Sequence, residues 1–182
     1  MATSERAPAD LSGMARDFAV ATADGATDAG HKPLSAFLSR VRQALGMDIA
    51  FICRFAEERL VYQVVSAAAD GPSAVAPGNS DPLVDSYCKR IIEGRLPRFI
   101  PDSNALDETR SLPITQRLGI GAYLSVPILL QDGRVFGTIC CFSHEPKPEL
   151  SSDDADALQD VANAIAAGVD RNGQLRGDIW MG

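Results

Sequence analysis

The sequence predicts an α+β domain in which antiparallel strands form one sheet and an amphipathic helix lies near each end of the chain. Apolar residues recur at helical spacing in 34–45 and again in 158–169. Between them, two long apolar runs, "IGAYLSVPILL" and "RVFGTICCFS", are joined by the hairpin turn "QDG". The length of 182 residues suits one domain with tails, so we predict a mobile segment at 1–31, a domain at 32–171 and a tail at 172–182.

Charge and hydropathy exclude several classes of protein. The net charge of −7 argues against a nucleic-acid-binding surface, which needs a clustered basic stripe. No apolar run has the length of a membrane span, and the start of the chain lacks the basic-then-apolar pattern of a signal peptide. We therefore predict a cytoplasmic location.

The first half of the domain contains one helix, a pair of strands and a second helix. "KPLSAFLSRVRQALG" predicts an amphipathic helix with Pro33 in its first turn and Gly46 at its end. "DIAFICRF" and "RLVYQVVSA" are rich in β-branched and aromatic residues, which favours two strands around the polar turn "AEE". After a Gly/Pro/Ser-rich loop, we expect a helix from 81 to 94 that is capped by Asp81. Its apolar face would comprise Val84, Cys88, Ile91 and Ile92.

The second half of the domain contains the strongest strand signal and the closing helix. "RLPRFI" predicts a short strand, "PDSNALDETRSLP" an irregular loop and "ITQRLG" a brief helix before the long hairpin. Ser151 and Asp154 resemble a capping box at the start of the last helix.

Strand alternation divides each long strand of the hairpin into two faces. One face is aliphatic and is expected to pack on the first and last helices. Both faces are too apolar to meet water, so the sheet must be covered on both sides. The other face mixes aromatic rings with two hydroxyls, which suits a small cavity with a few orienting polar groups, although the hydroxyls could equally bond to nearby backbone. These residues are Tyr123, Ser125, Phe136, Thr138 and Phe142.

The order of these elements resembles a GAF domain over roughly residues 33–171. The resemblance is carried most specifically by "SYCKRIIEGRLPRFIPD" and by "IGAYLSVPILLQDGRVFGTICCFS", in which a strand ends in Val-Pro before a polar turn and a Gly-containing strand. The first of these stretches is similar to bacterial GAF domains that lie beside cyclic-di-GMP enzymes or histidine kinases. The resemblance implies an antiparallel sheet of five to six strands, with terminal helices on one face and a small-molecule pocket on the other. It also implies a homodimer through the terminal helices.

The resemblance extends to phytochrome GAF domains, but the residues for a bound cofactor are missing. Covalent bilin attachment in that group needs a Cys-His pair just before the segment matching "QRLGIGAY", and residues 104–119 contain neither residue type. For haem, His31 lies in the predicted mobile segment and His144 in a turn, where a histidine is usually solvated. We therefore expect no cofactor.

The four cysteines lie inside apolar segments and form no C-x-x-C pair. Cys140 and Cys141 point to opposite faces of a strand and cannot chelate as a unit, so we expect reduced structural thiols and no metal. Thiol catalysis, as in methionine sulfoxide reductases of GAF fold, would require a reactive Cys88. A buried thiol without a basic neighbour is expected to be inert.

The sequence therefore predicts a sensory or regulatory domain without catalytic activity. It would bind a small molecule and signal through its terminal helices to an output domain or protein. The alternatives are a ligand-free dimerisation module and, less favoured, a thiol-based redox enzyme. Strand alternation and the resemblance together predict nine ligand-binding residues: Tyr87, Cys88, Phe99, Asp102, Tyr123, Ser125, Phe136, Thr138 and Phe142.

Overall fold

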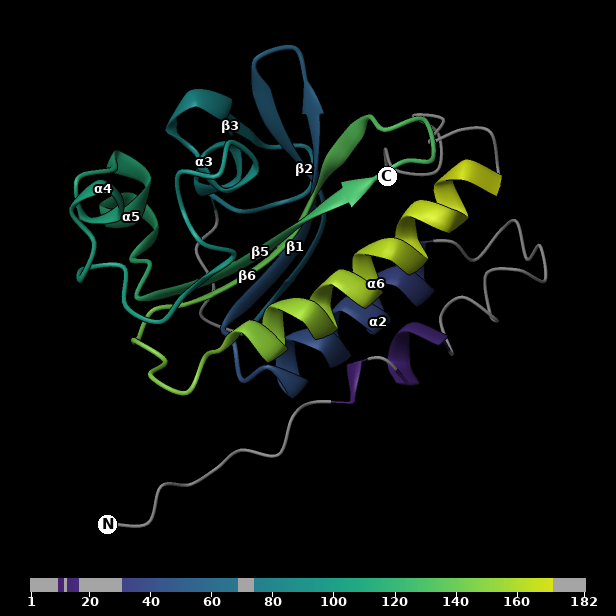
Figure 1. The fold of residues 1–182 in the computed structure, drawn as a ribbon, viewed down its shortest axis with the longest axis horizontal. Coiled ribbons are helices and arrows are strands. Elements are labelled where there is room, and N and C mark those ends of the chain that lie inside the picture. The colour runs from purple at the N-terminus through teal and green to yellow at the C-terminus, as the bar shows by residue number, and fades with distance from the viewer. Residues whose placement is uncertain (1–9, 12, 17–30, 69–73, 172–182) are drawn as a thin grey trace.

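A six-stranded antiparallel sheet lies between two layers of helices (Figure 1). The structure is a computed structural model that describes residues 10, 11, 13–16, 31–68 and 74–171. The strand order is β3-β2-β1-β6-β5-β4, and all neighbouring strands are antiparallel. The α+β class and the strand number are as predicted.

Two long helices cover one face of the sheet: α2 (His31–Ala44) and α6 (Ser152–Arg171). Both follow the predicted periodicity, with Leu38 of α2 and Leu158 of α6 fully buried. At the start of α6, the backbone N–H of Ser151 donates to the Asp154 carboxylate at 3.1 Å, as in a capping box.

The central strands come from two hairpins that lie side by side. β1 (Ile49–Ala56) and β2 (Arg59–Ala67) form the first, and β5 (Ala122–Leu129) and β6 (Val135–Ser143) form the second. β1 pairs with β6 in the middle of the sheet. Near the end of the second hairpin, Ile128 pairs with Gly137 and Leu129 with Val135, so Phe136 is an extra residue in a β-bulge.

The segment from 80 to 94 differs from the predicted single helix. Asp81 lies in a short edge strand, β3 (Ser80–Pro82), and a 3-10 turn (Leu83–Asp85) follows. The helix proper, α3 (Tyr87–Ile92), begins after Ser86, whose Oγ accepts from the backbone N–H of Lys89 at 3.2 Å. The prediction that Asp81 caps the helix was therefore wrong.

Two residues of the predicted apolar face are exposed: Val84 because it lies in the 3-10 turn rather than in the helix, and Ile92 because it is the last residue of α3. Val84 is 59% exposed and Ile92 is 38% exposed, whereas Cys88 and Ile91 are buried as expected. β4 (Phe99–Ile100) follows, and α5 (Pro113–Leu118) matches the predicted brief helix. A short helix that the sequence did not predict, α4 (Asp107–Arg110), interrupts the expected loop.

The sheet separates two hydrophobic clusters. The helix-side cluster contains the inner faces of α2 and α6 and the aliphatic face of the strands, including Leu124, Val126 and Ile128. The roof-side cluster lies beneath α3 and α5 and contains the opposite face, including Phe51, Tyr123 and Phe142. Both faces of the sheet are therefore covered, as the composition of the strands predicts.

Part of the segment predicted to be mobile belongs to the helix-side cluster. Leu11 is fully buried and Ala15 is 5% exposed in a helical stretch at 11 and 13–16. Most of segment 1–31 and all of the predicted tail at 172–182 lie outside the described residues. Among the residues described, no helix combines the length and the apolar character that crossing a membrane requires.

Candidate functional site

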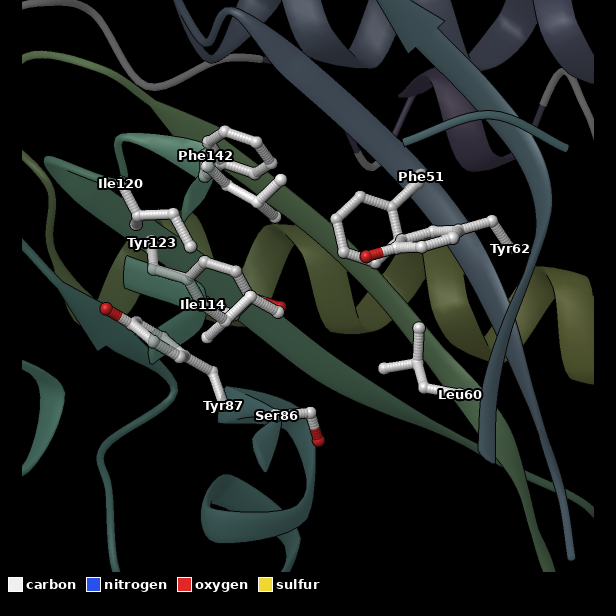
Figure 2. A pocket seen from close by; sticks show the side chains of 10 residues that line it. Phe51, Leu60, Tyr62, Ser86, Tyr87, Ile114, Ile120, Tyr123 and Phe142 are labelled. Atoms are coloured by element: carbon white, nitrogen blue, oxygen red, sulfur yellow. The ribbon is translucent and has the colours of Figure 1, made fainter. Parts of the chain in front are cut away.

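The roof-side cluster is built around aromatic rings from the sheet and from α3. The rings of Tyr87 and Tyr123 lie 4.5 Å apart between centroids, and the ring of Tyr123 stacks with that of Phe142 at 6.5 Å. Phe51 packs edge-to-face against Tyr62 at 5.0 Å. Figure 2 shows these side chains converging on one small space, with Tyr87 approaching from α3 and the others from the strands.

The space between these side chains is a cavity of about 10 Å³. A volume of that order holds about one water molecule, whereas pockets for small organic ligands measure roughly 300–1,000 Å³. The structure therefore shows this face packed by its own side chains. The cavity is lined by Phe51, Leu60, Tyr62, Ser86, Tyr87, Ile114, Leu118, Ile120, Tyr123 and Phe142.

Three cysteine thiols meet beside this cavity, within the same cluster. Cys53 comes from β1, Cys140 from β6 and Cys88 from α3, and their Sγ atoms all lie within 4.8 Å of one another. The Sγ atoms of Cys88 and Cys140 are only 3.4 Å apart, and none of the three residues is exposed. From the sequence these cysteines are expected to be structural thiols, and the fold brings three of them together.

Three oxygen atoms surround the sulfurs. Thr138 Oγ1 lies 2.9 Å from Cys53 Sγ and 3.1 Å from Cys140 Sγ, and it donates to Cys88 Sγ at 3.2 Å. Ser125 Oγ is 3.2 Å from Cys140 Sγ, and the Tyr123 hydroxyl is 3.3 Å from Cys88 Sγ. The hydroxyls that were predicted to orient a ligand therefore contact the thiols.

These contacts divide the thiols by acidity. Burial raises the pKa of Cys53 and of Cys140 well above the ordinary value. Burial also acts to raise the pKa of Cys88, but hydrogen bonds from the two other thiols and from Thr138 outweigh it and bring that pKa well below its usual range.

A polar layer closes the roof around the cavity. The Tyr62 hydroxyl donates to Asp81 at 2.6 Å, and Arg117 of α5 forms an ion pair with the same carboxylate at 2.6 Å. The Tyr87 hydroxyl lies 2.6 Å from Thr115 Oγ1. These bonds connect α3, α5 and the β3 edge strand across the top of the aromatic cluster.

Six of the nine residues predicted to bind a ligand lie in this region. Tyr87, Tyr123 and Phe142 line the cavity, and Cys88, Ser125 and Thr138 belong to the thiol and hydroxyl group beside it. Whether they bind a ligand stays a prediction.

The other three lie elsewhere. Phe136 packs against the helix-side cluster because the bulge shifts the alternation of β6, and Phe99 packs against the same cluster from β4. The Asp102 carboxylate accepts from the backbone N–H of Asn104 at 2.9 Å, which stabilises its own loop. The structure therefore places these three residues away from the cavity.

The first hairpin and α5 also line the cavity, although none of their residues was among those predicted to bind a ligand. Phe51, Leu60 and Tyr62 come from β1 and β2, and Ile114 and Leu118 come from α5. Alternation along β1 was the available signal, because Phe51 and Cys53 share a face opposite to Ile52.

Solved structures with the same fold include several photoreceptor domains. The phycoerythrobilin-bound GAF domain of a cyanobacterial phytochrome is 17% identical, with a TM-score of 0.70, over 89% of this chain and 97% of that one. The chromophore-binding domain of a Stigmatella aurantiaca phytochrome is 19% identical, with a TM-score of 0.60, over 91% of this chain and 62% of that one.

A further structure of this fold comes from a different kind of protein. The GAF domain of an Acinetobacter phosphoenolpyruvate-protein phosphotransferase is 13% identical, with a TM-score of 0.64, over 90% of this chain and 95% of that one. No curated protein matches the sequence. A family model described as the GAF domain matches residues 31–169. The chain therefore belongs to the GAF domain family.

Proposed function

We propose that this protein is a sensory or regulatory GAF domain without catalytic activity, which binds a small ligand on the roof side and signals through α2 and α6. The observation that supports this proposal is that the same strands carry both clusters. In β6, Cys140 belongs to the roof-side cluster and Cys141 to the helix-side cluster. A change in packing under α3 therefore acts on the backbone that supports α6.

Ligand entry would require the roof to move. The cavity of about 10 Å³ is far below the volume of an organic ligand, so α3 and α5 would have to separate from the sheet. Because only open molecules can bind, the apparent affinity equals the affinity of the open form multiplied by the fraction of molecules that are open. A ligand that binds the open form better would shift that population and with it the packing of the sheet.

The residues that would attach a bilin or ligate a haem are not in place for either cofactor. Residues 104–119 contain no cysteine or histidine, and His144 is exposed and does not line the cavity. We therefore propose that the ligand is neither of these groups, unlike that of the phycoerythrobilin-bound relative.

Native mass spectrometry of the full chain, purified from a bacterial extract and compared with its denatured mass, tests this proposal. We expect a noncovalent adduct that is lost on denaturation. An Ile114→Trp variant, which fills the cavity from α5, should lack the adduct. A Gln116→Trp variant on the exposed face of the same helix should retain it.

Hydrogen exchange in α6, measured with and without the adduct, then tests the signalling part. Slower or faster exchange in α6 is the expected result. An adduct that persists in Ile114→Trp would contradict the proposed pocket, and unchanged exchange would contradict the coupling to α6.

The second candidate function is a ligand-free dimerisation module, which the near absence of a cavity favours. Against it, the exposed positions of α6 are polar: Ser152, Asp153, Asp156, Asp160 and Asn163. The apolar residues of α6 that stay in part accessible, Ala157, Ala164, Ala167 and Val169, are half-buried and leave little apolar area for a stable homodimer. An adduct-free protein that forms a clean dimer in native spectra would favour this candidate over the sensor.

A further inference from the structure

We propose that Cys53, Cys88 and Cys140 form a binding site for a single monovalent copper ion, Cu(I). The inference concerns binding alone, and it holds whether or not the terminal helices respond. It is carried by three sulfurs from three different elements that the fold brings within 4.8 Å of one another.

The geometry fits one metal ion. Metal–thiolate bonds of about 2.3 Å place three sulfurs around an ion roughly 4 Å apart. The Cys88 and Cys140 sulfurs, now 3.4 Å apart, need to separate only slightly to reach that spacing. Two of the three thiols are held by adjacent strands of the sheet, so most of the site exists before the ion arrives.

The donor set favours Cu(I) over Zn(II). Thiolate ligands select Cu(I), zinc and iron–sulfur clusters. Structural zinc sites are almost always tetrahedral and take a fourth cysteine, histidine or carboxylate ligand. The group of converging ligands in the described chain contains three cysteines alone, and the nearest further atoms are hydroxyl oxygens. Cu(I) is satisfied by two or three sulfurs.

The surrounding hydroxyls can stabilise the negative charge that the bound site would carry. Binding of Cu(I) to two thiols releases two protons and leaves a centre of charge −1, with the third thiol as a neutral ligand. A buried anion is costly unless hydrogen bonds stabilise it. Thr138, Ser125 and Tyr123 each lie within hydrogen-bonding distance of a sulfur, and each hydroxyl can donate a hydrogen bond to a thiolate.

Entry of the ion depends on α3. This helix has six residues, which is far shorter than a helix that is stable by itself. The ion pair between Lys89 and Glu93 within the helix is solvent-exposed and contributes little, so the main ion pair to break is that of Arg90 with Glu108 of α4 at 3.1 Å. Opening of α3 would lift Cys88 from the sheet and expose Cys53 and Cys140 to solvent.

The chain provides a matched control in Cys141. It is next to Cys140 on the same strand and is equally buried, but it lies in the helix-side cluster. Removing its thiol therefore perturbs packing to a similar extent without touching the proposed site. Thr138→Val provides a second variant, because it keeps the shape of the side chain and removes the hydroxyl.

The test is an anaerobic titration of the reduced full chain with Cu(I), in competition with the coloured chelator bathocuproine disulfonate. We expect one equivalent to bind, and we expect Cys88→Ala and Cys140→Ala each to weaken binding by about 100-fold or more, while Cys141→Ala leaves it unchanged. Thr138→Val should weaken binding by about 10-fold. Zn(II) should not compete with Cu(I) at equal concentration.

X-ray absorption at the copper edge on the wild-type protein keeps the test valid if a variant fails to fold. Two or three sulfur neighbours are expected. Nitrogen or oxygen ligands, an equal loss of binding in Cys141→Ala, or preference for zinc would overturn the proposal. So would a Cys88–Cys140 disulfide that forms in air and is the only change detected, because the pair would then be a redox couple.

Discussion

Replacing Gly137 by alanine tests how tightly the centre of the sheet is packed. Gly137 pairs with Arg54 of β1 and with Ile128 of β5, at the bulge of β6. A Cβ atom at this position would lie 1.8 Å from the carbonyl oxygen of Cys53 and 2.8 Å from its carbonyl carbon. Because the obstruction is backbone, no change of rotamer can relieve it.

The expected loss follows from the size of that overlap. Real Cβ atoms essentially never come within 3.0 Å of another heavy atom, so β1 and β6 would have to separate by about 1 Å at this point. Overpacking typically costs about 1–3 kcal/mol, and a clash with the backbone of a central strand places Gly137→Ala at or above about 3 kcal/mol. For a chain of this length, that corresponds to a Tm about 6–12 °C lower.

Urea unfolding followed by far-ultraviolet circular dichroism measures this loss, with the m-value as the check that both states are unchanged. Gly168→Ala in α6 is the control, because a Cβ there meets nothing within 4 Å. Helix propensity predicts that this variant gains about 0.5–1 kcal/mol. A loss below about 1 kcal/mol in Gly137→Ala, at an unchanged m-value, would refute the packing argument.

Three further variants test other parts of the structure. Tyr62→Phe removes the 2.6 Å hydrogen bond to the Asp81 carboxylate, and we expect a loss of about 1.5–3 kcal/mol in the free energy of unfolding; a loss near zero would mean that the bond does not persist in solution. Leu11→Ala should cost about 2–5 kcal/mol because this side chain is fully buried, and an unchanged Tm would show that the segment is not docked. Burial raises the pKa of Cys141 from 9.0 to about 12, so between these pH values the folded protein retains a proton that the unfolded chain loses. The contribution of the Cys141 thiol to the free energy of unfolding is therefore complete below pH 9.0. Above that pH it falls by about 1.4 kcal/mol per pH unit. Unfolding curves above pH 9.0 should show a shallower decline for Cys141→Ala than for the wild type, and equal slopes would contradict the assignment.

The parts of the fold that the sequence predicts are those set by long, regular patterns. The first and last helices and both hairpins extend over many residues, so several side chains report the same period. Prediction failed where a short local interaction decides the structure. At Asp81, pairing with Leu60 in an edge strand and the ion pair with Arg117 outweigh the tendency of aspartate to cap a helix.

The site was predicted in part for the same reason. Alternation correctly places Tyr123, Ser125, Thr138 and Phe142 on one face, because β5 and β6 are regular there. A β-bulge cannot be predicted from the alternation of apolar residues, and the bulge in β6 places Phe136 on the other face. The meeting of the three thiols depends on the register between β1 and β6 and on the height of α3 above the sheet, neither of which is present in local sequence.

The alternation of β6 also explains how the two sides of the sheet can be linked. Cys140 contacts the roof-side thiols, and the next residue, Cys141, packs in the helix-side cluster. No polar network is needed between the sides, because one backbone segment carries both contacts. Interiors are close-packed, so moving one of these side chains requires the strand, and with it α6, to adjust. The size of any signal is limited by how much better a ligand binds one arrangement of that strand than the other. A ligand held by the strand itself, as at Cys53 and Cys140, acts on this arrangement more directly than one held by the roof alone.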